Sequence, residues 1–273
     1  MAGRTVVITG ASDGIGAAAA VELAKRGHHV VVVGRSPRKT AAVAAQTGGE
    51  YFVADFAALD AVRDLASRLL AHCGRIDVLA NNAGAMFGPK RRLTADGHEL
   101  TFQVNYLAPF LLTRLLTGRL LESGGTVINT SSAAHRMGRV NLKDLELEKT
   151  YGPFRAYAAA KLELVLFTRE FDRRWRSRGA TSTAFHPGLV ATNFLGGHGA
   201  AARAASRSPL RRLVLTPEKG AGTLVQLAGG VPGQDYVTGE YYQRGKVAGI
   251  NRAARNRALA QELWSRSVAM LEG

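Results

Sequence analysis

The segment TVVITGASDGIG (Thr5–Gly16) joins a short apolar run to a loop that contains three glycines. The apolar run is β-branched, and Gly10, Gly14 and Gly16 follow it with the spacing G-x-x-x-G-x-G. This order predicts a buried strand, a tight turn and the start of a helix, where glycine lets the backbone approach a bound pyrophosphate. An ordinary flexible turn has a similar composition, so the segment alone leaves its function open.

The rest of the chain alternates short β-branched runs with longer stretches rich in alanine, leucine and arginine. This order predicts an α/β fold, in which helices cover both faces of a parallel sheet. Strands are expected at Thr5–Thr9, Val30–Val33, Tyr51–Ala54, Val78–Ala80, Val127–Thr130 and Ser182–Phe185. Helices are expected at Gly14–Arg26, Leu59–His72, Leu100–Leu116 and Ala156–Arg178. No internal repeat or low-complexity linker divides the chain, so we expect one domain over residues 1–273.

The composition favours a soluble protein of a reducing compartment. Of the 273 residues, 46% are hydrophobic, which is enough for a full core without disulfide bonds. The single cysteine, Cys73, excludes an intramolecular disulfide. No apolar stretch reaches the roughly 18–20 uninterrupted residues of a membrane span. Asp13 interrupts the region where a signal peptide would need apolar residues. We therefore expect a cytoplasmic protein without a membrane span.

The chain is strongly basic, with 36 lysines and arginines against 21 acidic residues and a net charge of +15. The arginines gather in three segments, at residues 173–178, 203–212 and 251–257. No zinc-ligand spacing, RNA-binding aromatic signature or basic heptad accompanies them. A solvated basic face therefore explains the charge better than a nucleic-acid surface does, and attraction of a polyanionic cofactor is a further contribution.

Two more segments lie where the carboxyl ends of the predicted strands meet, which is where open α/β sheets bind their ligands. Asp55 ends the third predicted strand, and its carboxylate can accept a hydrogen bond from an adenine amino group. The sequence NNAG (Asn81–Gly84) follows the fourth strand and places an amide and small residues near a ribose. Together with the glycine loop, they indicate a dinucleotide site.

The end of the second strand indicates which dinucleotide binds. A carboxylate for the 2′-hydroxyl of NAD is expected about 20 residues beyond the glycines, but Gly34 and Arg35 stand there. A guanidinium binds phosphate as a bidentate fork, so the sequence predicts a preference for NADP(H) over NAD(H). Further basic or hydroxyl residues that can help are Ser36, Arg38 and Lys39. The alternative is a surface arginine at the start of a loop.

The motif YAAAK places Tyr157 and Lys161 four residues apart in a predicted helix, so both project from one face. A free tyrosine titrates at about pH 10 and is a poor acid or base at neutral pH. Because an ammonium favours the phenolate, we expect Lys161 to lower the pKa of Tyr157. The segment NTSSAAH (Asn129–His135) precedes this helix with two serines at a strand end. A hydroxyl there can hydrogen-bond a substrate oxygen as charge develops on it.

These motifs, in this order, resemble the short-chain dehydrogenase/reductase family in its non-extended branch. The matching segments cover nearly the whole chain: TGASDGIG at Thr9–Gly16, Asp55, NNAG, VNYLAPF with Asn105, Ser131–Ser132, YAAAK, and HPGLVAT at His186–Thr192. The stretches INTSSAAH, NLKDLELEK and KLELVLFTREF are similar to the retinol-dehydrogenase-like subgroup. The resemblance implies a three-layer Rossmann fold, a doubly wound parallel sheet of about seven strands, and an oxidoreductase that interconverts carbonyls and alcohols.

The resemblance also implies a catalytic tetrad of Asn105, Ser132, Tyr157 and Lys161. Tyr157 would exchange a proton with the substrate oxygen, Ser132 would polarise that oxygen, and Lys161 would hold the nicotinamide ribose. Asn105 would hold a water that links Lys161 to solvent. Alignment of the two serines favours Ser132 over Ser131. The implied cofactor contacts are Gly10, Ser12, Asp13, Gly14, Ile15, Gly16, Arg35, Asp55, Phe56, Asn81, Ala83, Gly84, Tyr157, Lys161, Pro187, Gly188, Val190 and Thr192.

The substrate side is less defined by the sequence. The insertion Arg136–Phe154 is expected beside the substrate mouth, and the Gly196–Ser208 stretch predicts a flap near 190–215, with a plain surface loop as the alternative. Apolar residues indicate a hydrophobic or medium-sized small-molecule substrate: Met86, Phe87, Leu189, Phe194 and Leu195. The insertion can alter helix-mediated dimer contacts, so monomer, homodimer and homotetramer all stay open.

Other functions are also compatible with parts of the sequence. Histidines lie without metal-ligand spacing, so no metal site is expected. A nucleotide sensor that keeps the fold but not turnover is one alternative, although such a protein has no need of both Tyr157 and Lys161. A nucleic-acid-binding protein is the more remote alternative, and it would bind DNA or RNA with a steep dependence on salt.

Overall fold

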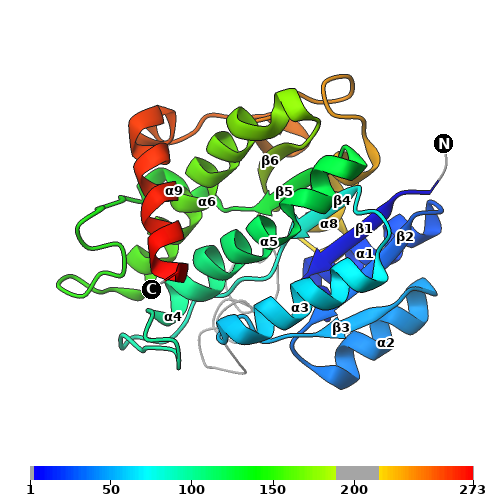
Figure 1. Ribbon diagram of the computed structural model, residues 1–273, viewed down its shortest axis with the longest axis horizontal. Coiled ribbons are helices and arrows are strands. Elements are labelled where there is room, and N and C mark those ends of the chain that lie inside the picture. The colour runs from blue at the N-terminus through cyan, green and yellow to red at the C-terminus, as the bar shows by residue number, and fades with distance from the viewer. Residues whose placement is uncertain (1–2, 189–214, 273) are drawn as a thin grey trace.

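The computed structural model describes residues 3–188 and 215–272, and these ranges form one eight-stranded sheet between two layers of helices (Figure 1). The strands are β1 (Thr5–Thr9), β2 (His29–Gly34), β3 (Tyr51–Val53), β4 (Val78–Asn81), β5 (Thr126–Thr130), β6 (Thr181–His186), β7 (Tyr241–Gln243) and β8 (Lys246–Val247). Their order is β3-β2-β1-β4-β5-β6-β7-β8. All neighbours are parallel except β7 and β8. The doubly wound parallel sheet is therefore confirmed, with eight strands where about seven were expected.

The alternation of side chains along β1 builds two separate cores. Val7 joins the core under α3 (Leu59–His72), α5 (Ala108–Ser123) and α6 (Pro153–Trp175). Val6 and Ile8 face the opposite side of the sheet and join the other core. Because both faces of the strand are buried, nearly every position is apolar.

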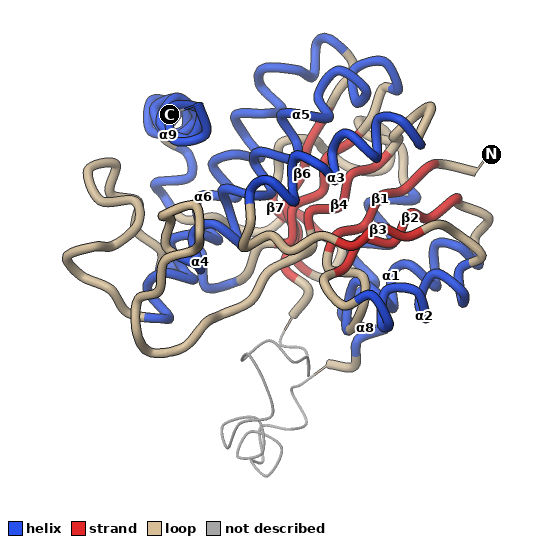
Figure 2. Tube along the Cα trace, turned by 60° about the horizontal axis from the view of Figure 1, so that its bottom comes forward, coloured by secondary structure: helices blue, strands red, loops and turns tan. Residues whose placement is uncertain are grey.

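The helices of the second core are α1 (Gly14–Lys25), α2 (Pro37–Thr47) and α8 (Pro217–Gly229). Figure 2 shows these three on one side of the sheet and α3, α5 and α6 on the other. The segment from Pro37 to Thr47 is a helix that the sequence did not predict. Its moderately polar composition gives no clear helical pattern of apolar residues. The local signals for a helix are Ser36, which caps the first turn, and Pro37, which occupies the first helical position.

The expected helix at Leu100–Leu116 is not continuous. The chain forms a single turn, α4 (Leu100–Phe102), then the π-helical segment η1 (Gln103–Leu107), and only then α5. A π-helical turn adds one residue per turn and is common at functional sites, because it changes the direction in which side chains project. Asn105 lies inside this segment.

The C-terminal helix α9 (Arg257–Glu272) covers the outer surface of α5 and α6 (Figure 1). Trp264 on α9 packs its ring at 5.0 Å from Phe110 of α5 and 5.8 Å from Phe167 of α6. The hydroxyl of Ser267 is 2.8 Å from that of the buried Tyr106. This face of α5 and α6 is therefore occupied by the chain's own last helix.

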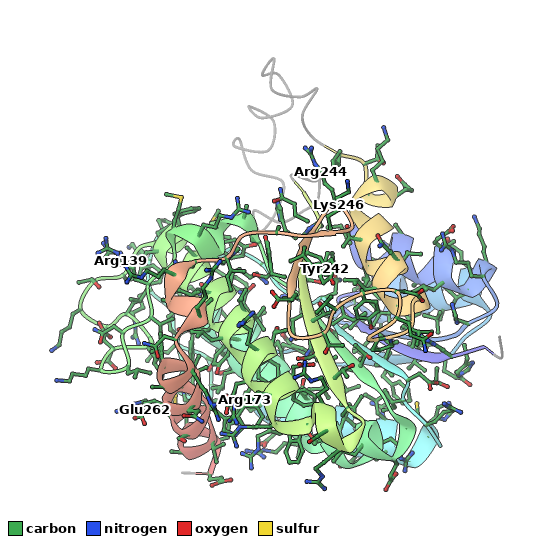
Figure 3. The ribbon with its side chains drawn as sticks, turned by 90° about the horizontal axis from the view of Figure 1, so that it is seen from above. Arg139, Arg173, Tyr242, Arg244, Lys246 and Glu262 are labelled. Atoms are coloured by element: carbon green, nitrogen blue, oxygen red, sulfur yellow. The ribbon has the colours of Figure 1, made fainter. Side chains whose placement is uncertain are left out.

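The sheet ends in a hairpin of β7 and β8, which Figure 3 shows from above with Arg244 and Lys246 labelled. Arg244 and Gly245 form its two-residue turn, with φ angles of 52° and 73°. Two positive φ angles match the turn type that follows the natural twist of paired strands. The hairpin also lies against α8, since the Gly245 amide donates to Thr223 at 3.2 Å.

None of the helices in the described part of the chain combines the length and apolar character needed to cross a bilayer.

Candidate active site

The loops after β1 and β4 meet at the centre of the sheet. Between these two strands the strand order reverses direction, which is where open α/β sheets form their ligand crevice. Gly10 has φ of 65°, and a Cβ atom on it would lie 2.7 Å from the Cα of Ala83. Only glycine fits this approach, so the glycine spacing of the first loop reflects contact with the loop after β4.

The loop after β1 leads directly into α1. The Asp13 side chain accepts from the Gly14 amide at 2.8 Å and caps the helix. The first amides of a helix have no acceptor within it, so Ile15 and Gly16 present a partly positive helix end to this crevice. Lys39 forms a 2.7 Å ion pair with Asp13 and thereby links the start of α1 to α2.

The end of β2 leaves no room for the carboxylate of an NAD-binding site at position 34. A Cβ atom on Gly34 would lie 2.5 Å from the Thr40 hydroxyl oxygen and 2.7 Å from the Cβ of Ser12. Arg35 follows on the surface, and it makes no hydrogen bond or ion pair with the described residues. The exposed Arg35 therefore follows directly after a glycine that packs against Ser12 of the first loop.

The NNAG segment contains two asparagines with different surroundings. Asn81 is buried and donates to Thr113 at 3.0 Å and to Asn129 at 2.9 Å, so its side chain is committed to the interior of the fold. Asn82, the second asparagine, was not predicted to have a role of its own. Its amide donates to the carbonyl oxygens of Thr9 and Gly10, at 3.0 and 3.3 Å, and binds the two loops together.

Asp55 and Phe56 follow β3 and have opposite environments. The Asp55 side chain is exposed and accepts from the Ala57 amide at 3.0 Å. Phe56 is buried, and its carbonyl accepts from Gln103 at 3.2 Å. The side chain of Phe56 is therefore part of the core, and Asp55 is the polar group available at this strand end.

Asn105 connects the π-helical segment to the NNAG loop. Its amide donates to the Ala85 carbonyl at 2.8 Å, and its Oδ1 accepts from the Ala85 amide at 3.2 Å. A Cβ on Gly84 would be 2.6 Å from that Oδ1 and 3.0 Å from the Nζ of Lys161. The structure thus brings Asn105, Gly84 and Lys161 together. A larger residue at position 84 would collide with the side chains of Asn105 and Lys161.

The two serines after β5 have separate roles in the structure. The Ser131 hydroxyl is buried and donates to the Lys161 carbonyl at 2.8 Å, so it holds β5 against α6. Ser132 caps the short helix η2 (Ala133–Met137), its Oγ accepting from the Ala134 amide at 3.2 Å. The Ser132 side chain also hydrogen-bonds to Tyr157. The contact with Tyr157 distinguishes Ser132 from its neighbour.

Tyr157 and Lys161 lie on one face of α6, as their spacing predicts, and both are buried. The Lys161 Nζ donates to the Thr130 carbonyl at 3.0 Å and lies 5.5 Å from the centre of the Tyr157 ring.

The expected lowering of the Tyr157 pKa is not found in the chain itself. Burial raises the pKa of this phenol above its usual value, and the hydrogen bond with Ser132 opposes the increase. Burial also lowers the pKa of Lys161 to about 7, so its ammonium is itself disfavoured. The spacing of the motif predicts that Lys161 is near Tyr157, but it carries no information on how deeply the two side chains are buried. The effect of desolvation on their pKa values could therefore not be predicted from it.

The HPG segment follows β6. Gly188 has φ of 93°, and a Cβ on it would lie 2.6 Å from Leu215, so the turn after Pro187 requires glycine. Val190 and Thr192 lie outside the described residues. So do Leu189, Phe194, Leu195 and the Gly196–Ser208 stretch that was predicted as a flap.

The insertion between Ser132 and Tyr157 packs against the long loop after the NNAG segment. Glu146 accepts from the Glu99 amide at 2.5 Å and lies 3.0 Å from the His98 ring. The Tyr151 hydroxyl donates to the Gly88 carbonyl at 3.3 Å. Met86 and Phe87 precede Gly88 on that loop, and both are half-buried.

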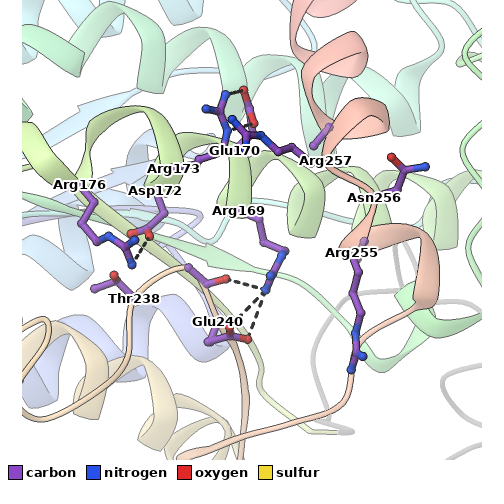
Figure 4. Close-up of a pocket in the computed structure, with 13 residues that line it drawn as sticks. Arg169, Glu170, Asp172, Arg173, Arg176, Thr238, Glu240, Arg255, Asn256 and Arg257 are labelled. Atoms are coloured by element: carbon purple, nitrogen blue, oxygen red, sulfur yellow. Dashed lines mark hydrogen bonds and ion pairs between the residues drawn. The ribbon is translucent and has the colours of Figure 1, made fainter.

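Part of the basic charge is neutralised within the chain. A cavity of about 260 Å³ lies between the end of α6 and the start of α9 (Figure 4). On its walls Arg173 pairs with Glu170 at 2.5 Å, and Arg169 pairs with Glu240 at 3.3 Å. These arginines are therefore structural partners of acidic residues. In the described ranges, no group of three or more histidine, cysteine or acidic side chains is arranged to hold a metal ion.

Comparisons with known proteins agree with this geometry. The sequence model of the family described as short chain dehydrogenase matches residues 4–202. A protein of Streptomyces sp. (strain C5) named as a daunorubicin C-13 ketoreductase is 42% identical over 275 residues, covering 98% of this chain and 92% of that protein. Human retinol dehydrogenase 13 is 36% identical over 282 residues, covering 98% and 85% respectively.

Two solved structures are similar as well. A Mycobacterium paratuberculosis protein superposes with a TM-score of 0.79 at 34% identity, over 99% of this chain and 94% of that one. A metagenomic short-chain oxidoreductase in complex with NADP superposes with a TM-score of 0.62 at 27% identity, over 85% and 93%.

Proposed function

Since the chain belongs to the short-chain dehydrogenase family, in its retinol-dehydrogenase-like subgroup, we propose that it is an NADP(H)-dependent oxidoreductase with Tyr157 as acid and base. Its general class is an oxidoreductase acting on carbonyls and alcohols, as in its relatives. The observation that carries the specific proposal is a chain of contacts: Asn105 and Lys161 meet at Gly84, Lys161 lies beside the Tyr157 ring, and Tyr157 hydrogen-bonds to Ser132.

The nicotinamide cofactor supplies the hydride, which its C4 atom gives to a carbonyl carbon or takes from an alcohol. The residues of the crevice suit such a cofactor, because Gly10, Gly34 and Gly84 let the surrounding segments pack closely and add no side chain of their own. The amino end of α1 would hold the pyrophosphate, and Asp55 the adenine.

Tyr157 would carry the proton at the substrate oxygen. In reduction its hydroxyl protonates that oxygen, and Ser132 donates a second hydrogen bond while charge develops there. A phenol whose pKa is raised by burial is a weak acid, so the proton must be drawn from it by the charge on the substrate. Lys161 opposes this increase when it carries its own proton, and the ribose of the cofactor would be its further partner.

The preference for NADP(H) is the second part of the proposal. Close packing around Gly34 excludes an acidic side chain, and the next residue is the exposed Arg35. A guanidinium favours a 2′-phosphate over a 2′-hydroxyl. One similar structure contains NADP, which supports the same cofactor.

The substrate is proposed to be an apolar ketone, aldehyde or alcohol. One relative is named for reduction of a ketone at C-13 of daunorubicin and another for dehydrogenation of retinol. Met86 and Phe87 are half-buried apolar side chains on the loop after NNAG, and they fit such a substrate.

A substrate screen tests the proposal. Bulky aldehydes, ketones and alcohols are incubated with NADPH, NADH, NADP+ or NAD+, and the change in absorbance at 340 nm is followed, with Tyr157→Phe as the control. We expect turnover with at least one apolar carbonyl, higher kcat/KM with NADPH than with NADH, and none with the variant. Equal turnover by Tyr157→Phe would contradict the proposed chemistry, and binding of NADPH without turnover of any substrate would favour a sensor.

A further inference from the structure

His135 lies three residues after Ser132, within η2, and it is fully buried. Its ring Nδ1 is 2.6 Å from the Ser132 carbonyl oxygen, and its backbone amide donates to the same oxygen at 3.1 Å. Two donors from one residue therefore hold the backbone of Ser132. No step of the proposed chemistry uses this histidine.

The contact determines the form of the imidazole. A carbonyl oxygen can only accept a hydrogen bond, so the proton must lie on Nδ1. In the neutral ring Nε2 is then an acceptor, and none of the described residues donates to it. Burial lowers the pKa of His135, which favours this neutral form.

The turn that contains His135 is held from two further sides. Asn251, which follows the hairpin of β7 and β8, places its amide nitrogen 3.2, 3.1 and 3.0 Å from the carbonyl oxygens of His135, Arg136 and Gly138. Gly138 in turn packs on α6, where its Cβ would lie 2.3 Å from the Ala158 carbonyl oxygen, directly after Tyr157. The turn is thus fixed between the helix of Tyr157 and the C-terminal part of the chain.

The ring of His135 is also held in place. Tyr241 on β7 packs against it with 4.4 Å between ring centres, and both side chains are buried. The ring therefore has little freedom to leave the Ser132 carbonyl, and its direction is set by β7 as well as by η2.

We propose that His135 is a positioning residue, which orients the Ser132 hydroxyl toward Tyr157 by its Nδ1–H bond to the Ser132 carbonyl. Asn251 supports it by fixing the carbonyl groups of the same turn. Only one rotatable bond, Cα–Cβ, lies between the Ser132 backbone and its Oγ, so fixing the backbone restricts the directions in which the Oγ can point. This inference rests on the proposed function, in which Ser132 polarises the substrate oxygen.

Two isosteric substitutions test which ring nitrogen matters. The amide nitrogen of asparagine can take the place of Nδ1, whereas that of glutamine lies nearer the place of Nε2. We expect His135→Asn to keep most of the activity, and His135→Gln and His135→Phe to lower kcat about tenfold or more. KM for the substrate and the Kd of NADPH are expected to change less than about twofold, because the loss occurs in the transition state.

The opposite result contradicts the proposal: His135→Gln active and His135→Asn impaired would assign the role to Nε2. Full activity in all three variants would remove any role for the residue. The melting temperature of each variant is measured alongside. An equal loss of kcat in Asn and Gln variants that scales with a fall in melting temperature would show a merely structural residue and overturn the proposal.

A second variant keeps the test independent of substitutions at His135. In Asn251→Asp the donor to three carbonyl groups is lost, while the acceptor for the Ala253 amide at 2.8 Å is kept. We expect kcat to fall about threefold or more. Asn256→Asp is the matched control, since the Asn256 side chain accepts from the Leu259 amide at 3.0 Å and donates to none of the described residues. Equal kcat in the two variants would contradict the supporting role of Asn251.

The test also separates this inference from the proposed function. Tyr157→Phe is assayed with the same substrate and cofactor. If it is inactive while every His135 variant keeps full activity, only the positioning role is wrong. If Tyr157→Phe is as active as the wild type, the proposed function itself fails.

Discussion

The loops on the cofactor side and the turn on the catalytic side of the crevice are built in different ways. At Gly10, Gly34 and Gly84 a Cβ atom would collide with atoms of a neighbouring loop or helix, so glycine is required there for lack of space. Around Ser132 the positions are dictated by hydrogen bonds from His135 and from Asn251, far along the chain. The first region depends on the absence of side chains and the second on their presence.

This difference determines how each region responds to substitution. Steric conflict cannot be relieved without moving backbone, so a methyl group on the cofactor side should have a large effect. A lost hydrogen bond can be replaced by water or by another side chain, so effects on the catalytic side should vary with the group removed.

The largest effect is expected for Gly84→Ala. The new methyl group would lie 2.6 Å from the Asn105 Oδ1, and Asn105 is held by its own hydrogen bonds. We expect kcat/KM to fall by more than about 100-fold, because the displacement reaches Lys161 as well as Asn105. Gly88→Ala is the control, since nothing lies within 4 Å of its Cβ position. Similar kcat/KM in the two variants would show that lack of space does not determine the residue at position 84.

Substitution of the two serines should affect different properties: kcat for Ser132 and the free energy of unfolding for Ser131. Ser132→Ala is expected to lower kcat about 100-fold, as for the loss of an oxyanion donor. Ser131→Ala removes the buried bond to the Lys161 carbonyl, so it should cost about 1 kcal/mol of stability and keep most of kcat. Steady-state kinetics and urea unfolding measure the two effects. A reversed pattern would mean that Ser131 faces the substrate.

Arg35→Ala tests which cofactor the crevice prefers. Loss of a charge-assisted hydrogen bond should lower kcat/KM with NADPH about 30-fold and leave kcat/KM with NADH nearly unchanged. Arg26→Ala removes another surface arginine, one already paired with Glu22, and serves as the control. An equal decrease with both cofactors would show that Arg35 does not recognise the 2′-phosphate.

The smallest effect is expected on the stability of the cofactor-free protein at different pH values. The pKa of Lys161 is about 7 in the fold and about 10.4 in an unfolded chain. Between these values the unfolded chain binds more protons, so this lysine makes the protein more stable as pH rises from about 7 to about 10. Lys161→Met should flatten the increase, by about 1 kcal/mol or more between pH 7 and 9. Parallel pH curves for the two proteins, from urea unfolding, would contradict the burial effect.

The parts of the fold that the sequence predicted are those with a strong local signal. β1 and α3 have the expected bounds, because each has a clear period and apolar pattern. Tyr157 and Lys161 share a face of α6 as expected, since four residues is about one helical turn. The glycine-rich turns were also predicted from the sequence, because positions without room for a Cβ atom accept glycine only.

The parts that were not predicted depend on contacts distant in sequence. The helices α2, α8 and α9 and the strands β7 and β8 were missed, since their short or mixed patterns become meaningful only against the sheet. The break of the expected Leu100–Leu116 helix at Asn105 has no local signal either. The hydrogen bonds from Asn251 to the turn after Ser132 join residues more than a hundred positions apart in the sequence.

We propose that this chain moves a hydride from NADPH to a carbonyl carbon while Tyr157 supplies the proton. The most direct measurement uses NADPH carrying two deuterium atoms at C4, an apolar ketone from the substrate screen, and mass spectrometry of the product alcohol. We expect one deuterium on the carbinol carbon with the wild type, and no alcohol above background with Tyr157→Phe. Alcohol without deuterium on that carbon, or labelled alcohol formed equally fast by Tyr157→Phe, would contradict it.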